Sequence, residues 1–476
     1  MSNNEVAIPL SPKDKKLVTI GSWLLMFYIA CGGTTLAISQ SFILRKFDAM
    51  HLFSLSTIII SLGAAIMTPI GGKLSDIIGI KKLVIISVTV AVLSNIALAF
   101  GTNITLYFIF SLINSLSKGA FTASPAILAH MTNKKSDVPK VMGYLASAIA
   151  GGTFIGALIA GRFNDMGLTE IGITLPAVFV LIAGLLIMKG LPNIKMERKI
   201  TLDYVGIVLL AILITSFVLS FNFGPTFGWT NPYVLVGFAV LIASAIAFVS
   251  YESKVEKKGQ SPIIAMSLFK NKEFSALLLI GLIAYYYQAV MTNYGTLASL
   301  EILGESATIS SMLTMPRMAI TLFFPIITGV WVSKKSTNSW KAIALSTIIV
   351  AVAFLPLVGI SPSMSIMVLF ASFTVTGIAE GFRAVSITPA AQELLTPENL
   401  STGTALVNFM NTLSSVFATT ISGVLFNAAG DDKVAGMQAV FISTIVITLV
   451  GFVLVLTVIR KNQEARYKEL TASQAQ

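Results

Sequence analysis

Residues 83–101 read LVIISVTVAVLSNIALAFG, a run without a charged side chain that directly follows the basic pair Lys81 and Lys82. An α-helix rises about 1.5 Å per residue, so a run of this length crosses the roughly 30 Å hydrocarbon core of a bilayer. The run therefore predicts a membrane-spanning helix whose first end is held at the membrane surface by two lysines.

Similar apolar runs, separated by short polar loops, fill almost the whole chain. The pattern predicts an all-α polytopic membrane protein with 14 transmembrane helices. The predicted helices lie near 17–43, 51–71, 83–101, 104–130, 141–162, 171–188, 203–223, 231–251, 274–299, 308–332, 341–359, 363–389, 402–426 and 437–459.

Composition and charge agree with this architecture. Hydrophobic residues make up 55% of the 476 residues and charged residues 11%, far from the averages of soluble proteins. Of 32 Lys and Arg, 25 fall in tails and loops on one face, four on the other face and three inside helices. Basic residues near helix ends stay in the cytoplasm, so both termini are expected there.

The net charge of +11 is explained by basic loops that face anionic lipid, and no nucleic-acid partner is expected. Lysines greatly outnumber arginines, which fits an AT-rich genome, and we expect a multi-pass protein of a bacterial cytoplasmic membrane. The lone Cys31 lies inside the first apolar run, so neither a disulfide nor a thiolate metal site is expected. We expect no cofactor and no metal.

Two longer cytoplasmic segments divide the chain into six, two and six helices. This arrangement predicts two six-helix bundles related by a pseudo-two-fold axis, with the substrate path between them near the bilayer midplane. The predicted parts are an N-terminal tail (1–16), an N-terminal bundle (17–188), a linker (189–202), a two-helix insertion (203–251), a second linker (252–273), a C-terminal bundle (274–459) and a C-terminal tail (460–476).

The turn after the second predicted helix, residues 72–82, reads GKLSDIIGIKK. Gly72 and Gly79 permit tight backbone geometry and close helix approach. Asp76 stands within reach of a neighbouring helix N-terminus, where a negative charge is favourable, or of a basic residue. A carboxylate in this position can hold the cytoplasmic side shut, although an ordinary charged loop would read similarly. The predicted gate motif comprises Gly72, Leu74, Asp76, Gly79 and Lys81.

This turn resembles the signature loop of the major facilitator superfamily, Gly-x-Leu-Ala-Asp-Arg-x-Gly-Arg-Lys, at all five gate-motif residues. The helix count and the segment 262–274 resemble the 14-span drug:proton antiporter branch. The resemblance implies a secondary transporter that works by alternating access.

The sequence departs from that branch at three positions. Gly32-Gly33-Thr34 lacks the acidic residue that is common in the first helix, Ser115 stands where an Arg is common, and Ala157 stands where Pro is usual. Drug specificity and the proton-coupling residue are therefore not carried over from the family.

Small residues recur at every fourth position of the helix predicted at 141–162 and make a smooth ridge that lets another helix approach closely. The ridge serves tight packing, a sliding surface for alternating access, or both. The predicted helix-packing motif comprises Gly152, Gly156, Ala160 and Gly161.

Four charged residues remain inside predicted helices: Lys118, Arg317, Glu380 and Arg383. Each costs roughly 2.5–3.5 kcal/mol at mid-bilayer, so these side chains are expected to face a cleft or a paired site rather than lipid. Glu380 and Arg383 are spaced i,i+3 and share a helix face. Their proximity predicts either an ion pair that merely neutralises both groups or a proton-coupling site at Glu380, the only carboxylate well inside a predicted helix.

Lys118 and Arg317 have no evident acidic partner in the sequence. The four charges then sum to a surplus of positive charge, which favours an anionic ligand. Two alternatives stay open: Lys118 can extend toward the cytosol, and Arg317, which follows Pro316, can have a structural role at a helix kink.

Polar and aromatic residues on several predicted helices are candidates for contact with an amphipathic substrate. Helix-to-helix hydrogen bonding is the commoner role for any single one of them, and at least one of the three consecutive tyrosines must point elsewhere because successive helix residues diverge by about 100°. The candidates are Tyr285, Tyr286, Tyr287, Gln288, Asn114, Asn408 and Asn411.

The sequence thus predicts a proton-coupled secondary transporter, not an enzyme, that exports amphipathic small molecules as a monomer in the lipid bilayer. An alternative is a carrier for uptake or exchange of organic anions such as bile salts or fatty acids. A distant alternative, a membrane enzyme acting on lipids, is disfavoured because His51 and His130 are predicted on opposite sides of the bilayer. The sequence contains no Gly-x-x-x-x-Gly-Lys-Ser/Thr loop, so ATP-driven pumping is not expected.

Overall fold

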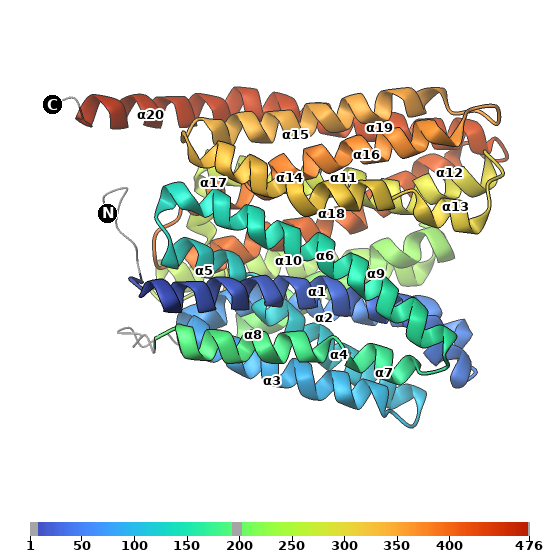
Figure 1. The fold of residues 1–476 in the computed structure, drawn as a ribbon, viewed down its shortest axis with the longest axis horizontal. Helices are drawn as coiled ribbons and strands as arrows, with labels where there is room; N and C mark the ends of the chain where they lie inside the picture. Colours follow the sequence, from blue (N-terminus) through green and yellow to red (C-terminus); the bar gives the residue numbers. More distant parts are fainter. Residues whose placement is uncertain (1–7, 193–201, 475–476) are drawn as a thin grey trace. The chain divides into compact units, whose positions relative to one another are not determined.

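The computed structural model describes residues 8–192 and 202–474. Within these ranges every regular element is a helix, and fourteen helical segments are long and apolar enough to cross a membrane (Figure 1). The all-α architecture and the number of spans are therefore confirmed. Most of the predicted linker 189–202 lies outside the described residues.

The first ten helices are α1 (Pro12–Lys46), α2 (Phe53–Ile78), α3 (Ile80–Ala99), α4 (Ile104–Phe121), α5 (Ser124–Thr132), α6 (Val138–Asp165), α7 (Thr169–Thr174), α8 (Ala177–Gly190), α9 (Tyr204–Phe227) and α10 (Pro232–Lys257). The remaining helices are α11 (Lys272–Val290), α12 (Thr296–Glu301), α13 (Ala307–Met312), α14 (Met315–Ser333), α15 (Asn338–Phe354), α16 (Ile366–Ala384), α17 (Ile387–Gln392), α18 (Leu400–Ala428), α19 (Lys433–Leu454) and α20 (Arg460–Gln474).

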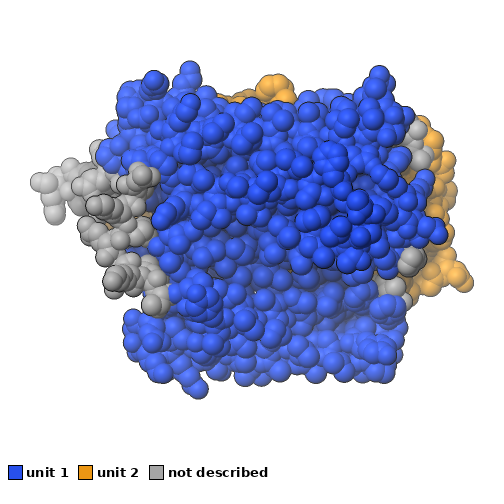
Figure 2. Space-filling view, turned by 90° about the horizontal axis from the view of Figure 1, so that it is seen from below, with its two compact units in different colours: residues 1–135, 148–267, 395–409 blue, residues 136–147, 268–394, 410–476 orange. Residues whose placement is uncertain are grey.

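The chain forms two compact units, which Figure 2 distinguishes by colour. Unit 1 comprises residues 1–135, 148–267 and 395–409, and unit 2 comprises residues 136–147, 268–394 and 410–476. The α9–α10 hairpin, which corresponds to the predicted insertion, belongs to unit 1. Helices α6 and α18 each contribute residues to both units.

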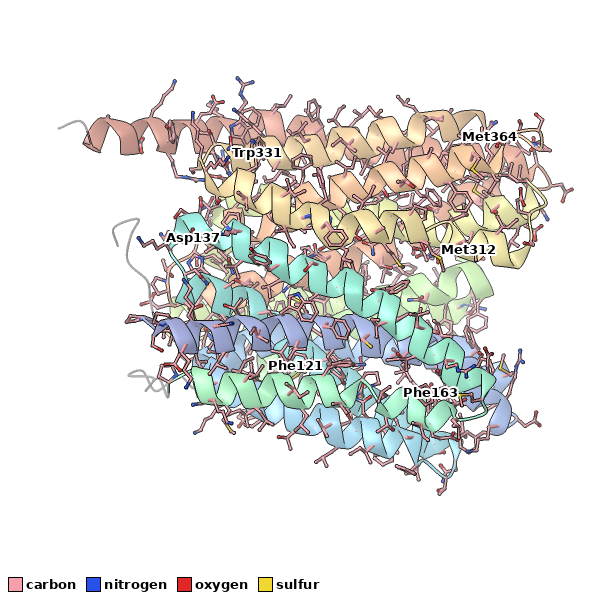
Figure 3. All side chains as sticks on the ribbon, in the orientation of Figure 1. Phe121, Asp137, Phe163, Met312, Trp331 and Met364 are labelled. Atoms are coloured by element: carbon pink, nitrogen blue, oxygen red, sulfur yellow. The ribbon has the colours of Figure 1, made fainter. Side chains whose placement is uncertain are left out.

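In unit 1, α2 packs along α4 and also contacts α9, while α1 packs along α8. The α2–α4 contact is close because Gly71 lies against the backbone of Ala120, where a side chain would not fit. Phe121, labelled in Figure 3, is fully buried in a core that also contains Tyr28 and Val84. Close contacts between helix backbones and large buried aromatic rings together hold this unit in place.

In unit 2, α16 packs between α14 and α15, and α19 contacts both α15 and α11. One apolar core of this unit contains Phe354, which lies edge-on to Phe441 with ring centroids 5.8 Å apart. A second aromatic contact joins Trp331, labelled in Figure 3, to Phe382 at 5.8 Å. The first contact joins α15 to α19, and the second joins α14 to α16, the helix that carries Glu380 and Arg383.

Several helices extend beyond the apolar runs from which they were predicted. Helix α2 continues through Asp76, and α10 continues through Glu252, whose exposed fraction is 0%. Glu380 is therefore not the only carboxylate buried within a helix, and that part of the prediction is wrong. The predicted tail 460–476 is helical as far as Gln474, and Arg466 of this helix forms an ion pair with Glu273.

Three of the predicted helices are interrupted close to a basic residue that lies within the span. The helix predicted at 104–130 is divided into α4 and α5, that at 308–332 into α13 and α14, and that at 363–389 into α16 and α17. Lys118 and Arg383 lie in the last turns of α4 and α16. The final carbonyl groups of a helix have no intrahelical donor and carry partial negative charge, so these positions favour a cation.

Ion pairs on the helix ends support the predicted topology. Lys46 pairs with Glu170 at 2.5 Å, and Lys433 pairs with Glu301 at 2.6 Å. In each pair both residues were predicted on the outer face, so the structure brings together groups that the charge pattern assigns to one side of the bilayer.

Candidate functional site

In unit 2, Arg317 and Arg383 form a charged cluster around Glu380. Arg383 forms a two-point ion pair with this carboxylate, and its Nε lies 3.2 Å from Glu380 Oε2. Arg317 Nη2 lies 3.3 Å from the same oxygen, and the hydroxyl of Tyr287 donates a hydrogen bond to it at 2.9 Å. Helices α11, α14 and α16 thus each contribute to a single carboxylate.

Glu380 and Arg383 share a helix face as the i,i+3 spacing predicts, and they form an ion pair. The expectation that Arg317 lacks an acidic partner is wrong, because the packing of α14 on α16 brings it to Glu380. Pro316 lies in the first turn of α14, directly before Arg317. The break between α13 and α14 and the arginine of the ion pair therefore lie in the same short segment.

The cluster is largely buried and carries a net charge of +1. Arg317 and Arg383 are 8% and 4% exposed, and the Glu380 side chain is 17% exposed. Nε of Arg317 has no hydrogen-bond partner among the described residues. A buried donor without an acceptor is costly, so this atom is free to donate to a further acceptor.

The three consecutive tyrosines point in different directions, as expected for successive residues of a helix. Arg383 Cζ lies 3.2 Å from the centroid of the Tyr285 ring, and Tyr287 binds Glu380. Tyr286 points away and lies within hydrogen-bonding distance of the hydroxyls of Ser422 and Ser443. Tyr286 therefore acts in helix packing, while Tyr285 and Tyr287 belong to the charged cluster.

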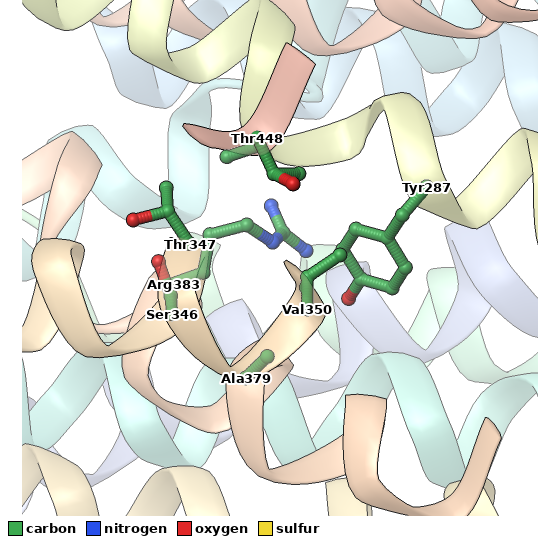
Figure 4. Close-up of a pocket in the computed structure, with 8 residues that line it drawn as sticks. Tyr287, Ser346, Thr347, Val350, Ala379, Arg383 and Thr448 are labelled. Atoms are coloured by element: carbon green, nitrogen blue, oxygen red, sulfur yellow. The ribbon is translucent and has the colours of Figure 1, made fainter. Parts of the chain in front are cut away.

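A small pocket adjoins Arg383 and Tyr287 (Figure 4). Its polar lining includes the hydroxyls of Ser346 and Thr347 on α15 and of Thr448 on α19. All three hydroxyls donate to carbonyl groups of their own helices and keep oxygen lone pairs free to accept a further hydrogen bond. These residues were not predicted, because isolated Ser and Thr within apolar runs give no distinctive signal.

Unit 1 contains a related arrangement around Lys118. Its Nζ lies 5.3 Å from the centroid of the Tyr28 ring, and the Tyr28 hydroxyl accepts hydrogen bonds from Asn95 at 2.5 Å and Asn114 at 3.4 Å. No carboxylate lies within 4.0 Å of Lys118 among the residues that the structure describes. Nδ2 of Asn114 donates within this network, and Tyr28 and Asn95 were not predicted.

The gate motif contacts the first turn of α18. The Thr402 hydroxyl donates to Asp76 at 3.1 Å, and a side chain at Gly72 would lie 2.6 Å from Cβ of Ala405. Asp76 thus lies beside the N-terminal turn of α18, one of the two positions that the sequence left open. Asp76 and Gly72 are one helical turn apart, so together they hold α2 against α18.

The remaining motif residues have separate positions. Gly79 joins α2 to α3 with φ of 84°, a conformation that favours glycine. Lys81 Nζ donates to the carbonyl oxygen of Leu191 at 2.6 Å, where α8 ends. Leu74 is half-buried. The motif therefore connects α2, α3, α8 and α18 within unit 1.

The predicted helix-packing motif contacts α1 through two glycines. A side chain at Gly152 would meet the backbone of Phe27, and one at Gly156 would meet the backbone of Cys31. Ala160 is fully buried. Gly161 is exposed and has nothing near it, so its assignment to this motif is wrong; it lies about 100° around the helix from Ala160.

Ser115 occupies a helix-packing position. Its hydroxyl accepts from the backbone N–H of Ala64 at 2.8 Å and donates to the carbonyl of Ile60. Both partners lie on α2. At the position where an Arg is common in the 14-span branch, this chain therefore has a serine that joins α4 to α2.

The other three candidate residues lie on α18 and α11. Oδ1 of Asn411 on α18 is near Gly281 of α11 and has no hydrogen-bond partner in the described chain. Asn408 lies one turn earlier on α18 and is half-buried, as is Gln288 on α11. The hydrogen bonds that hold Glu380 come from α11, α14 and α16, through the tyrosine and the two arginines described above.

Comparison with known proteins gives consistent results. Residues 22–203 and 342–475 match the model of the Major Facilitator Superfamily. The multidrug transporter protein MdtP of Bacillus subtilis (strain 168) is 23% identical over 415 residues, which cover 87% of this chain and 76% of MdtP. The methylenomycin A resistance protein of the same organism is 24% identical over 287 residues, 60% of this chain and 59% of that protein.

A solved structure shows the same fold. The human organic anion transporter MFSD10 (TETRAN) superposes with a TM-score of 0.62 at 16% sequence identity, covering 94% of this chain and 100% of that chain. The match to the family model confirms the predicted resemblance to the superfamily.

Proposed function

This chain belongs to the Major Facilitator Superfamily, and from that premise we propose that it is a proton-coupled secondary transporter that exports amphipathic small molecules by alternating access. The names of two relatives, a multidrug transporter and an antibiotic resistance protein, support export of such compounds. The observation that carries the proposal is the carboxylate of Glu380, which is held by two arginines and a tyrosine.

Glu380 couples proton movement to conformation because a proton competes with the arginines for the same carboxylate. While Arg317 and Arg383 contact Glu380, the carboxylate is neutralised by their charges. A proton replaces them only when the cluster opens, as it does when α14 and α16 separate or when a substrate engages an arginine. Moving one charge across 100 mV yields about 2.3 kcal/mol, enough to bias such an opening.

Asp76 forms the cytoplasmic gate in this proposal. Its carboxylate and Gly72 hold α2 against the N-terminal turn of α18. Release of this contact lets the cytoplasmic ends of the helices separate. The gate and the proton-coupling site thus lie on different helices and can be tested independently.

Transport by reconstituted protein tests the coupling role. Proteoliposomes of known orientation receive an imposed pH gradient, and uptake of a fluorescent lipophilic cation is followed. Glu380→Gln keeps the shape of the side chain but cannot take up a proton, so gradient-driven transport is expected to fall at least tenfold. Glu301→Gln, at an exposed ion pair, serves as the control. Unchanged gradient-driven transport by Glu380→Gln would remove the coupling role.

A second candidate, a carrier of organic anions, is supported by the charge of the cluster. The three ionised groups leave one net positive charge, and Arg317 Nε lacks an acceptor in the described chain. An anionic substrate that binds an arginine would release Glu380 to take up a proton, so anion and proton would move in the same direction. Uptake of a labelled bile salt that rises when the side it enters from is made acidic would favour this candidate over export of cations.

A further inference from the structure

A fully buried carboxylate lies in unit 1, at the end of the α9–α10 hairpin. Glu252 on α10 is 0% exposed. Its Oε2 accepts a hydrogen bond from the backbone N–H of Ile264 at 3.2 Å, which fixes the segment after the hairpin. Its Oε1 has no hydrogen-bond partner in the described part of the chain. This fully buried oxygen requires a donor or a cation.

Asp203, the N-cap of α9, directs a second unpartnered oxygen to the same place. Its Oδ1 accepts from the N–H of Gly206 at 2.8 Å and from the hydroxyl of Tyr251 at 3.1 Å, while Oδ2 has no partner among the described residues. A Cβ at Gly206 would collide with Glu252 Oε1 and lie 2.9 Å from Asp203 Oδ2. The two oxygens therefore face one another across the space that a glycine leaves.

The surrounding charges do not neutralise this pair. Lys73 on α2 is 9% exposed and interacts electrostatically with Asp76, Asp203 and Glu252, yet none of them forms an ion pair with it within 4.0 Å in the described chain. Three carboxylates thus share one neighbouring cation. One of the three, Asp76, also accepts a hydrogen bond from Thr402 on α18. Two neighbouring carboxylates in such a site do not both stay ionised without a further positive charge.

We propose that Asp203 and Glu252 share one proton and form a second proton-binding site on the α9–α10 hairpin, separate from Glu380. The site does not depend on the role proposed for Glu380. Loss of its proton adds a negative charge that attracts Lys73, the neighbour of Gly72 in the gate motif. The hairpin thereby senses proton concentration at the cytoplasmic end of the helices and acts on the gate.

Infrared spectroscopy of the purified full-length protein tests the shared proton directly. We expect a protonated-carboxyl C=O band at neutral pH, where exposed carboxylates are ionised. The band is expected to be absent in Glu252→Gln and unchanged in Glu256→Gln, the matched control one turn further along α10, whose carboxylate accepts from the Ser267 N–H in the loop. Glu380→Gln is also expected to retain it, which separates this proposal from the proposed coupling role.

Asp203→Asn provides the second variant, because Asn also caps helices well. Removing the neighbouring negative charge favours ionised Glu252, so the band is expected to disappear at lower pH than in the wild type. A band that is the same in both variants as in the wild type overturns the proposal. A second result would also overturn it: no band in the wild type, together with thermal stabilisation by Na⁺, Mg²⁺ or Ca²⁺ that Glu252→Gln abolishes. The two carboxylates would then bind a metal ion instead of a proton. If Glu252→Gln does not fold, Asp203→Asn decides.

Discussion

Arg383 lies over the ring of Tyr285, with its guanidinium carbon 3.2 Å from the ring centroid. Lys118 lies over the ring of Tyr28 in the same manner at 5.3 Å. In the predicted repeat, the two tyrosines are on the first helices of their six-helix halves and the two cations on the fourth. The repeat is weak in residue identity, yet this cation–aromatic contact occurs in both halves. It supports the predicted duplication.

The two contacts differ in charge balance, and this difference has a measurable consequence. Arg383 is neutralised by Glu380, whereas Lys118 has no carboxylate within 4.0 Å in the described chain. Lys118→Gln is therefore expected to lower the transport of an amphipathic anion at least tenfold while leaving that of a lipophilic cation unchanged. Transport assays in the same proteoliposomes measure both. Equal loss for the two substrates would show that Lys118 has only a structural role.

The ring of Tyr28 is expected to matter more than its hydroxyl for holding Lys118. Tyr28→Phe keeps the cation–π contact and loses the acceptor for Asn95, so it should destabilise the protein by about 1 kcal/mol. Tyr28→Leu also loses the ring face, at a further cost of about 0.5–2 kcal/mol. Thermal unfolding in detergent measures both variants. A larger effect for Phe than for Leu would contradict the assigned role of the ring.

Coupling among the buried charges is expected in a double-mutant cycle. Glu380→Ala leaves two cations without their carboxylate and should destabilise by about 3–5 kcal/mol. Arg383→Ala should cost less, because Arg317 still contacts Glu380. The double variant is expected to be more stable than the sum of the single effects predicts, since it removes both members of the pair. Strict additivity in thermal unfolding would show that the pair contributes no net interaction.

Thr402→Val tests the gate with a nearly isosteric change. It removes the hydroxyl that donates to Asp76 at 3.1 Å and leaves the rest of α18 intact. The contact should weaken by about 1 kcal/mol, so the state with an open cytoplasmic side becomes several-fold more populated. Alkylation of a cysteine introduced at the buried Ala405 reports this opening as a faster rate. Thr419→Val, a matched control later on α18, removes only an intrahelical hydrogen bond and should leave the rate unchanged.

Two glycines on α6 form a matched pair for helix packing. A side chain at Gly156 would collide with the backbone of Cys31, whereas Gly161 has nothing within 4 Å. Gly156→Ala is therefore expected to destabilise the protein and reduce transport. Gly161→Ala should be neutral or stabilising by up to about 1 kcal/mol, because alanine favours the helix. Thermal unfolding of the two variants decides, and the opposite ranking would contradict the close packing of α6 on α1.

The sequence alone predicted features that depend on local order along the chain. Apolar runs gave the fourteen spans, and i,i+3 spacing gave the contact between Glu380 and Arg383. The contact of Arg317 with Glu380 could not be predicted in this way, because 63 positions separate these residues and only the packing of α14 on α16 joins them.

The buried pair on the hairpin was missed for a different physical reason. Hydropathy ends the predicted helix at residue 251, where polar residues begin, whereas the structure continues α10 through Lys257. Glu252 is buried because the following segment folds back and donates the N–H of Ile264 to it. A loop that covers a carboxylate has no periodic pattern, so its effect was visible only in the folded chain.

The interruptions of α4 and α16 bear on which changes the protein tolerates. A straightened helix would return its last carbonyl groups to backbone partners and remove the partial negative charge that favours a cation in the last turn. Substitutions that repair the break are therefore expected to be harmful unless the cation is replaced as well. In these two segments, the helix break and the basic side chain are therefore expected to be retained or lost together.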